Sequence, residues 1–327
     1  MARYHLLSQY VWPDGAPTAI YAEQLAVRLR SRGADVVLVG GSGAYRDADR
    51  DRPDVAIVSP PHFVGRRGSL GSVAREYLSV ERAFREYIRT RVGRHDVVVA
   101  TSAPPNSVRL AREIERRGAA PVYWLQDYYP ELVRGILDPP EPLRRLLARW
   151  FDGQLRRWAR VVKIGANLGY EGENAVVIRN WPTVSFSTDV APTPKTALYS
   201  GNLGYGHLVS ALVAVCDELR AKGYAITVRG DGPGMSELPV WIDRQRPLTG
   251  RAELVRSYLQ SEIHLVAAHP AIQRAVFPSK LWNSLAARRT VLYSGFVGAM
   301  QQELQESVVS PYWEHLGQWD SLLKSLE

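Results

Sequence analysis

Residues 278–295 read Pro-Ser-Lys-Leu-Trp-Asn-Ser-Leu-Ala-Ala-Arg-Arg-Thr-Val-Leu-Tyr-Ser-Gly. The first part of this stretch predicts a helix that begins near Lys280, and a β-branched, apolar strand over 290–294 follows directly. Such a helix-to-strand step is the repeating unit of a parallel α/β sheet. The stretch therefore indicates an α/β fold, and the rest of the chain shows that the unit recurs.

Short apolar runs alternate with helical patterns along the whole chain. Predicted strands of the first half lie at 5–8, 36–40, 55–59, 97–101 and 122–126, and predicted helices at 18–32, 73–91 and 107–117. Predicted strands of the second half lie at 196–201, 225–229, 263–267 and 291–294, with helices at 208–222 and 313–326. Runs this short and apolar suit strands buried on both faces. We predict two Rossmann-like, doubly wound domains that face a cleft.

The length of 327 residues favours two domains over one core. Ser, Thr, Pro and Asp cluster at Ser185–Lys195, which indicates the junction. We predict an N-terminal domain over 1–186, a C-terminal domain over 187–310, and a last helix over 311–327 that packs back on the first domain. Ligands of such sheets bind at the carboxyl ends of the strands.

The composition excludes several classes of protein. The single cysteine, Cys216, excludes a disulfide framework and a cysteine metal site. The seven histidines are scattered without a metal-binding spacing, so we expect no metal and no cofactor. No apolar run reaches the roughly 18 residues of a membrane span, and no signal-peptide pattern is seen. We expect a cytoplasmic protein.

The net charge of +8 lies entirely in the first half. Residues 1–186 hold 28 basic and 20 acidic side chains, whereas residues 187–327 hold 13 of each. The segment Leu143–Phe151 mixes Arg with Leu, Trp and Phe, which is typical of a helix on an anionic membrane surface. A solvated helix with its apolar side in the core is the alternative. No nucleic-acid-binding motif accompanies the charge.

Lys280 is one of only five lysines among the 41 basic residues. Its place near a predicted helix start suits a phosphate group, because the first N–H groups of a helix are unpaired and lysine adds a compact positive charge. An ordinary surface lysine is the alternative.

Two glycine-rich turns follow predicted strands of the second half. They are Ser200–His207, which contains Gly201, Asn202 and Gly204, and Arg229–Pro233, which contains Gly230, Asp231 and Gly232. Glycines let the backbone approach a pyrophosphate closely. Together with Lys280 these turns favour a ligand that carries a diphosphate. The fingerprint of a nicotinamide dinucleotide site is missing.

Three loops of the first half also follow predicted strands. Tyr10–Thr18, with Gly15, allows close approach to a ligand, or forms a turn with Thr18 as the helix cap. Asp127 is placed to accept a hydrogen bond from a substrate hydroxyl, or to cap the next helix. Arg179–Pro182 reads as a turn, with substrate contact as the other possibility.

These motifs, in this order, resemble glycosyltransferase family 4, whose members have the GT-B fold. The matching segments are Leu7–Tyr10 with Gly15–Thr18, Gln126–Glu131, Asn180–Trp181, Tyr199–His207, Gly230–Pro233 and Pro278–Ala287, the last in the "P-S-K" variant of bacterial members. The resemblance implies transfer of a sugar from a nucleotide sugar, with retention at the anomeric carbon and usually without a metal. It also implies an acceptor-binding first domain and a nucleotide-sugar-binding second domain.

From the loops and the resemblance together, we expect a retaining, hexosyltransferase-type enzyme of cell-surface polysaccharide or glycolipid synthesis. The expected partners are a nucleotide sugar, a saccharide or lipid-linked acceptor and the inner face of the plasma membrane, and no nucleic acid. Expected catalytic residues are Asp127, Lys280 and Arg229. Expected donor-binding residues are Gly15, Gly201, Asn202, Gly204, His207, Gly230, Asp231, Gly232, Ser279 and Asn283.

The chain departs from the family at three positions. Ala275 and Asn283 stand where the family often has paired glutamates, and Tyr205 stands where it has an arginine. These departures motivate a second hypothesis, a non-catalytic GT-B protein that supports another transferase.

Overall fold

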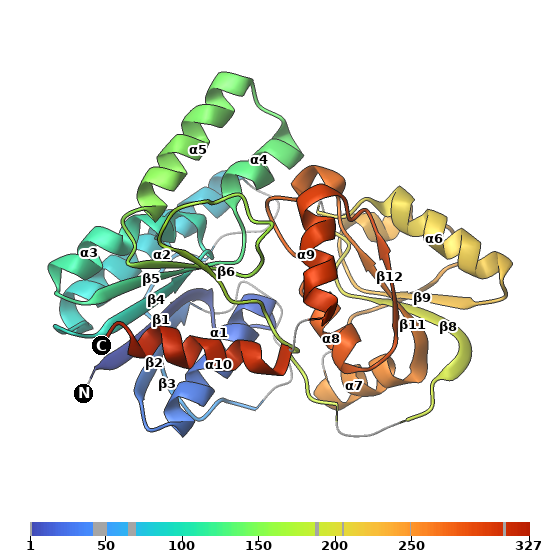
Figure 1. Cartoon of the computed structure of the whole chain (residues 1–327), viewed down its shortest axis with the longest axis horizontal. Coiled ribbons are helices and arrows are strands. Elements are labelled where there is room, and N and C mark those ends of the chain that lie inside the picture. Colours follow the sequence, from blue (N-terminus) through green and yellow to red (C-terminus); the bar gives the residue numbers. More distant parts are fainter. Residues whose placement is uncertain are drawn as a thin grey trace.

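The computed structural model describes residues 2–41, 51–64, 70–186, 190–204, 206–248, 250–309 and 312–327. These residues form two α/β domains that lie beside one another, each built on its own sheet (Figure 1). Every strand pairing in both sheets is parallel. The fold expected from the alternation of strands and helices is confirmed.

The first sheet has the strand order β3-β2-β1-β4-β5-β6-β7. Its strands are β1 (Arg3–Tyr10), β2 (Asp35–Gly41), β3 (Ala56–Val58), β4 (Val97–Thr101), β5 (Ala120–Leu125), β6 (Arg160–Lys163) and β7 (Ala175–Val177). Its helices are α1 (Pro17–Ser31), α2 (Leu70–Arg91), η1 (Pro105–Leu110), α3 (Ala111–Arg116), α4 (Tyr129–Leu137) and α5 (Glu141–Leu155).

The second sheet has the strand order β10-β9-β8-β11-β12. Its strands are β8 (Thr193–Ser200), β9 (Ala225–Arg229), β10 (Asp243–Gln245), β11 (Ser261–Ala267) and β12 (Thr290–Ser294). Its helices are α6 (Val209–Ala221), η2 (Pro233–Glu237), α7 (Arg251–Gln260), η3 (Pro270–Ile272), α8 (Lys280–Ala286) and α9 (Gly298–Val309).

Both sheets reverse their winding direction beside their first strand. The reversal lies between β1 and β4 in the first sheet and between β8 and β11 in the second. Connections leave such a point in opposite directions, so a crevice opens at the carboxyl ends of the strands. The loops after β1 and β8 are therefore the ones that the topology places at a ligand site.

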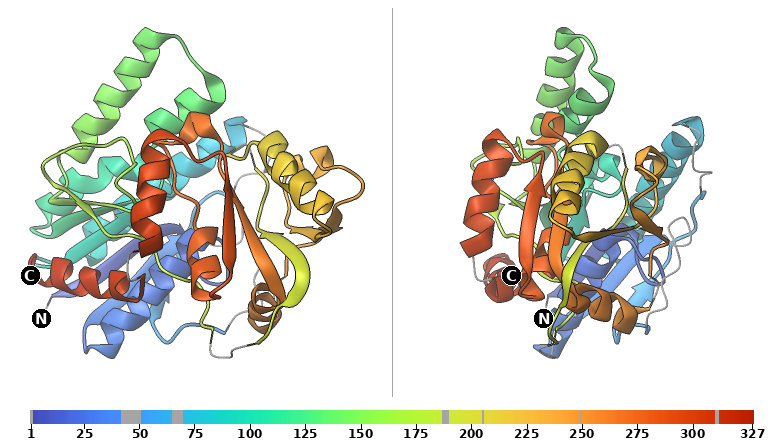
Figure 2. Two further views of the ribbon diagram at one scale, coloured as in Figure 1. Left: turned by 45° about the vertical axis from the view of Figure 1, so that its right-hand side comes forward. Right: turned by 90° about the vertical axis from the view of Figure 1, so that its right-hand side faces the viewer.

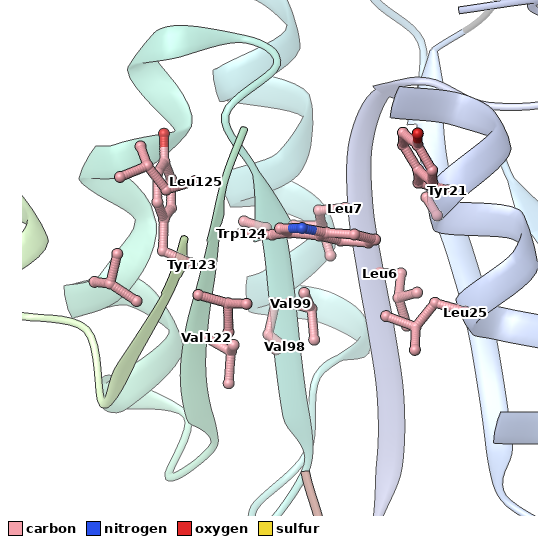
Figure 3. Packing of buried hydrophobic residues seen from close by; sticks show 14 of the residues in the cluster. Leu6, Leu7, Tyr21, Leu25, Val98, Val99, Val122, Tyr123, Trp124 and Leu125 are labelled. Atoms are coloured by element: carbon pink, nitrogen blue, oxygen red, sulfur yellow. The ribbon is translucent and has the colours of Figure 1, made fainter. Parts of the chain in front are cut away.

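The core of the first domain is made by fully buried strands. All five residues of β4 are buried, as are all residues of β5 after Ala120. Figure 3 shows Trp124 lying across the sheet toward Leu7, while Tyr123 points to the other side, as alternation along a strand requires. Strands buried on both faces explain why these segments read as continuous apolar runs.

The last helix, α10 (Tyr312–Lys324), leaves the second domain and lies against the first (Figures 1 and 2). The ring of Trp319 packs at 4.6 Å from the ring of Trp124. The buried carboxylate of Asp320 forms ion pairs with Arg28 at 2.8 Å and Arg32 at 3.1 Å. The helix is thus held both by ring packing and by partly buried charge pairs.

Several elements differ from the sequence-based expectation. The helix predicted over 107–117 begins as the 3-10 helix η1 and only then becomes α3. The sequence analysis did not anticipate β6, β10, α7 or α9. Within the described residues no helix is long and apolar enough to cross a membrane. Part of the predicted junction, 187–189, lies outside the described residues.

Candidate active site between the two domains

A cavity of about 400 Å³ lies between the two domains. Its volume is within the range of small-molecule sites. The first domain contributes Gly15, Pro17 and Ile20, and the segment between the domains contributes Thr183. The second domain contributes Ser200, Gly201, Asn202, Gly204, His207, Arg229, Pro247, Leu248, Leu254, Tyr258, Ser279, Lys280 and Asn283. The cavity thus brings most of the sequence-predicted residues together.

The loop after β8 and the start of α8 fit against each other. Gly201 has a φ of +137°, and a Cβ atom there would lie 2.0 Å from Cε of Lys280. Only glycine therefore permits this approach, in both backbone conformation and space. The absence of a side chain at Gly201 makes the channel through which the lysine stem reaches the cavity.

Lys280 is surrounded by neutral groups. Its Nζ lies 3.4 Å from the carbonyl oxygen of Asn202, 3.3 Å from Nε2 of His207 and 5.1 Å from the ring centroid of Tyr199. No carboxylate of the described residues forms an ion pair with it. Burial lowers the pKa of Lys280 to about 8, because no nearby negative charge compensates for the lost water.

His207 supports the lysine as a neutral ring. Burial, followed by the charge of Lys280, lowers the pKa of His207 to about 3. Its Nδ1 lies 3.2 Å from the carbonyl oxygen of Gly204, and an N–H donates there. Nε2 is then the acceptor that faces Lys280, so the carbonyl of Gly204 selects the tautomer that suits the lysine.

Arg229 presents a second positive charge to the cavity. Its Nε donates to Oε1 of Gln245 at 3.0 Å, and its other nitrogens contact Gln245 and the hydroxyl of Ser257. Burial lowers its pKa. Among the described residues no carboxylate lies within ion-pair distance, so neutral partners orient the guanidinium without cancelling its charge.

Gly230, Asp231 and Gly232 do not line the cavity. The amide of Leu203 donates to the carbonyl oxygen of Asp231 at 2.7 Å. A Cβ at Gly230 would lie 2.1 Å from the carbonyl oxygen of Gly201. The turn expected to bind the donor thus packs behind the loop after β8, because close backbone packing at this place also requires glycine.

Asn283 faces the segment between the domains. Its Oδ1 accepts the amide hydrogen of Thr183 at 2.8 Å, and its Nδ2 donates to Oγ1 of Thr183 at 2.9 Å. Asn283 and Thr183 both line the cavity. The amide expected to bind the donor is therefore engaged with the interdomain segment in this structure.

Asp127 follows β5 and borders the cavity without lining it. The hydrogen bond from Oγ1 of Thr18 to Oε1 of Gln126, at 3.0 Å, places this loop beside Pro17. Burial raises the pKa of Asp127 to about 6. Nε2 of Gln126 is buried and has no hydrogen-bond partner among the described residues. The carboxylate of Asp127, a hydrogen-bond acceptor, and the side-chain amide of Gln126, a donor, are thus neighbours in the chain on the first-domain side.

The helix-cap alternatives for Asp127 and Thr18 do not hold. The cap of α4 is Tyr128, and the cap of α1 is Ala16, so neither Asp127 nor Thr18 caps a helix. Ser279 precedes α8 without a side-chain cap hydrogen bond. Helix α8 has only seven residues, so the charge of Lys280, more than the helix itself, provides the attraction for an anion.

Sequence reasoning missed part of the cavity wall. Leu254 and Tyr258 lie on α7, whose apolar residues 254, 255, 258 and 259 have helical spacing that was readable. Pro247 and Leu248 follow the three-residue strand β10, which leaves no such signal. Tyr205 lies outside the described residues. Those residues contain no group of three or more His, Cys, Asp or Glu suited to a metal ion.

Known structures share this two-domain architecture. The sucrose-phosphate synthase of Thermosynechococcus elongatus is similar over 100% of this chain and 97% of its own, with a TM-score of 0.66 and 11% identity. The UDP-forming α,α-trehalose-phosphate synthase of Burkholderia vietnamiensis has a TM-score of 0.56 and 11% identity over 100% and 97%. The pneumococcal O-GlcNAc transferase, solved with UDP and GlcNAc, has a TM-score of 0.53 and 9% identity over 99% of each chain.

The two domains, each built on a parallel sheet, have the GT-B fold of these structures. Residues 18–164 match the family model described as "glycosyl transferase 4-like domain". The resemblance drawn from the motifs is confirmed. No curated protein sequence matches significantly.

Proposed function

We propose that this chain is a retaining glycosyltransferase that moves a sugar from a nucleotide-sugar donor to a saccharide or lipid-linked acceptor. One observation carries the proposal. Lys280 and Arg229 face one cavity, and no carboxylate of the described residues pairs with either. Two partly buried cations that have no ion-pair partner among the described residues make a site for a ligand that carries more than one negative charge.

The donor diphosphate is the ligand that fits these charges. The loop after β8 lets its backbone approach a pyrophosphate, and Lys280 reaches the same point past Gly201. When the bond between the anomeric carbon and the phosphate oxygen breaks, the electron pair stays on the diphosphate. Lys280 and Arg229 stabilise this developing charge, which is the step where fixed cations lower a barrier most.

The first domain is proposed to bind the acceptor. Asp127 and Gln126 follow β5 on the first-domain side, next to the cavity, and the amide of Tyr128 donates to the carbonyl oxygen of Ala275 at 2.7 Å. This contact holds the loop of Asp127 against the second domain. An ionised Asp127 accepts a hydrogen bond from a sugar or acceptor hydroxyl, which orients the attacking oxygen. Retention at the anomeric carbon and the hexosyl nature of the donor rest on the family resemblance, as does a role in cell-surface polysaccharide or glycolipid synthesis.

Calorimetry with UDP-, GDP-, TDP- and ADP-sugars tests the proposal. We expect one nucleotide class to bind at micromolar concentration or better. The engaged state of Asn283 and the presence of Ala275 motivate a second candidate, a non-catalytic GT-B subunit. Binding of none of the four donors supports that candidate and contradicts the enzyme.

A further inference from the structure

Helices α4 and α5 carry an apolar surface that points away from both cores. Its members, which we call the hairpin patch, are Ile136, Leu137, Leu143, Leu146 and Trp150. Leu137 is 72% exposed, Leu146 64% and Leu143 54%. Figures 1 and 2 show α5 projecting from the edge of the first domain. Five large exposed apolar side chains within fifteen residues of sequence exceed the scattered exposure of an ordinary surface.

The apolar face of α5 points to solvent, opposite to the direction found in a helix of a soluble domain. Leu143, Leu146 and Trp150 recur at the intervals that place side chains on one helix face. Only Phe151 and Leu155, in the last part of α5, are buried. A helix of a soluble domain turns its apolar face to the core, whereas α5 turns this face to solvent. The face is therefore built to contact something other than the chain's own core.

Basic side chains flank the hairpin patch. Arg145 and Arg149 alternate with Leu146 and Trp150 along the exposed side of α5. Arg145 pairs with Glu141 at 2.7 Å, and no ion pair of Arg149 occurs among the described residues. The domain that carries the patch also holds the whole positive excess of the chain. Leucine, tryptophan and arginine in this arrangement match the boundary between lipid chains and anionic headgroups.

We propose that the hairpin patch docks the protein on a bilayer that contains anionic lipid. Leu143, Leu146 and Trp150 enter the headgroup–acyl boundary, while Arg145 and Arg149 contact lipid phosphates. A second copy of the chain fits less well, because the arginines beside the patch would face one another. Since no described helix spans a membrane, the contact is peripheral.

The position of the hairpin links docking to the cleft. Helix α4 begins at Tyr129, two residues after Asp127, so the hairpin and the proposed acceptor loop are continuous in the chain. Docking therefore holds the acceptor side of the cleft near the bilayer, which suits a lipid-linked acceptor. This last link rests on the proposed function, whereas the docking itself does not.

Sedimentation of the full chain with vesicles tests the proposal. Vesicles of phosphatidylcholine alone are compared with vesicles that also contain 30% phosphatidylglycerol. We expect preferential binding to the anionic vesicles. L146Q/W150Q and R145Q/R149Q each lower the partition coefficient by about tenfold or more, since each buried apolar side chain and each arginine near the surface contributes on the order of 1 kcal/mol.

Matched variants control for surface area and charge. V240Q/V309Q changes two exposed apolar residues of the second domain, and R112Q/R116Q removes two exposed arginines of α3 at the same spacing of four. Both controls keep wild-type partitioning.

Equal binding to both vesicle types, or equal loss in patch and control variants, overturns the proposal. Self-association that L146Q/W150Q abolishes, measured by sedimentation velocity without lipid, favours a second copy and also overturns it. Donor calorimetry on L146Q/W150Q separates docking from the proposed function, because the patch lies outside the donor cavity.

Discussion

The side chain of Asn283 and the backbone of Thr183 hold helix α8 to the segment between the domains. Asn283 accepts the amide hydrogen of Thr183 at 2.8 Å, and the carbonyl oxygen of Thr183 accepts a hydrogen bond from Gln24 at 3.1 Å. Oε1 of Gln24 accepts in turn from Nε1 of Trp181 at 2.9 Å. A continuous chain of hydrogen bonds thus joins α8 to α1 of the first domain through the wall of the cavity.

Replacement of Asn283 by alanine is expected to destabilise the fold. It leaves the amide of Thr183 without its partner in a half-buried position, which costs about 1 kcal/mol. Denaturant unfolding measures this change in the free energy of unfolding. Thr183→Val keeps the amide bond and loses only the hydroxyl contacts, so its effect is the smaller one. Equal stabilities of the wild type and N283A would show that the chain of hydrogen bonds does not support the fold.

Replacement of Lys280 by methionine is expected to abolish tight donor binding. The loss in kcat/KM for the donor is about 2–4 kcal/mol if the lysine meets the leaving phosphate. Calorimetry and initial rates measure binding and turnover. Lys222→Met, at the exposed end of α6, is the control and retains both. Near-wild-type turnover of K280M contradicts the assignment of this residue.

The same substitution is expected to stabilise the protein without donor. Burial lowers the pKa of Lys280 from 10.5 to about 8, so the folded state holds fewer protons than the unfolded state between these values. The charged lysine therefore destabilises the fold below pH 8, and this penalty disappears as the pH rises toward 10.5. At pH 7 the free energy of unfolding of K280M should exceed that of the wild type by about 1–2 kcal/mol. K280M should therefore unfold at a higher temperature. The difference should shrink at pH 10, as thermal unfolding at both pH values would show.

Replacement of Gly201 by alanine is expected to mimic the loss of Lys280. The new methyl group would lie 2.0 Å from Cε of Lys280, and the φ of +137° is strained for alanine. The lysine would have to leave the cavity, so donor affinity falls by tenfold or more. At Gly204 an added Cβ meets nothing within 4 Å, so G204A keeps wild-type stability. Unchanged donor affinity in G201A would show that the lysine need not pass this point.

Asp127 predicts an acidic limit to activity. Burial raises the pKa of its carboxyl group to about 6, so a role that needs the ionised form is lost as the pH falls through 6. We expect kcat/KM for the acceptor to decline below pH 6 with an apparent pKa near this value. Asp127→Asn should lower the rate by 10²–10⁴-fold and remove this limb of the profile. If D127N keeps the same decline of kcat/KM below pH 6, this decline belongs to another titrating group.

The fold was predictable where burial and sequence agree. Strands such as Val97–Thr101 are buried on both faces, and their β-branched runs therefore stand out in the sequence. Strand β10, Asp243–Gln245, lies at the edge of its sheet and is polar and largely exposed, so pairing with β9 alone defines it. The strand order, which places β1 beside β4, depends on packing between distant segments and leaves no local pattern.

The candidate site was predictable where a loop follows a strand. Lys280, Gly201 and Arg229 could be placed together because parallel strands end at one edge of their sheet. The sequence could not show that Asn283 is engaged by Thr183, because the path between the domains is set by their packing. The sequence also could not show that the loop after β8 lines the cavity whereas the turn at Gly230 packs behind it, because both need glycine for close backbone contact.

The return of α10 has a mechanical consequence. The chain starts in β1 and finishes on the same domain, where the hydroxyl of Tyr4 contacts the carboxylate of Glu327 and both ends lie close together (Figure 1). The donor-side domain is thus a long excursion between two anchored ends. Because the chain crosses between the domains at Thr183 and again before α10, any opening of the cavity has to pivot about these two crossings.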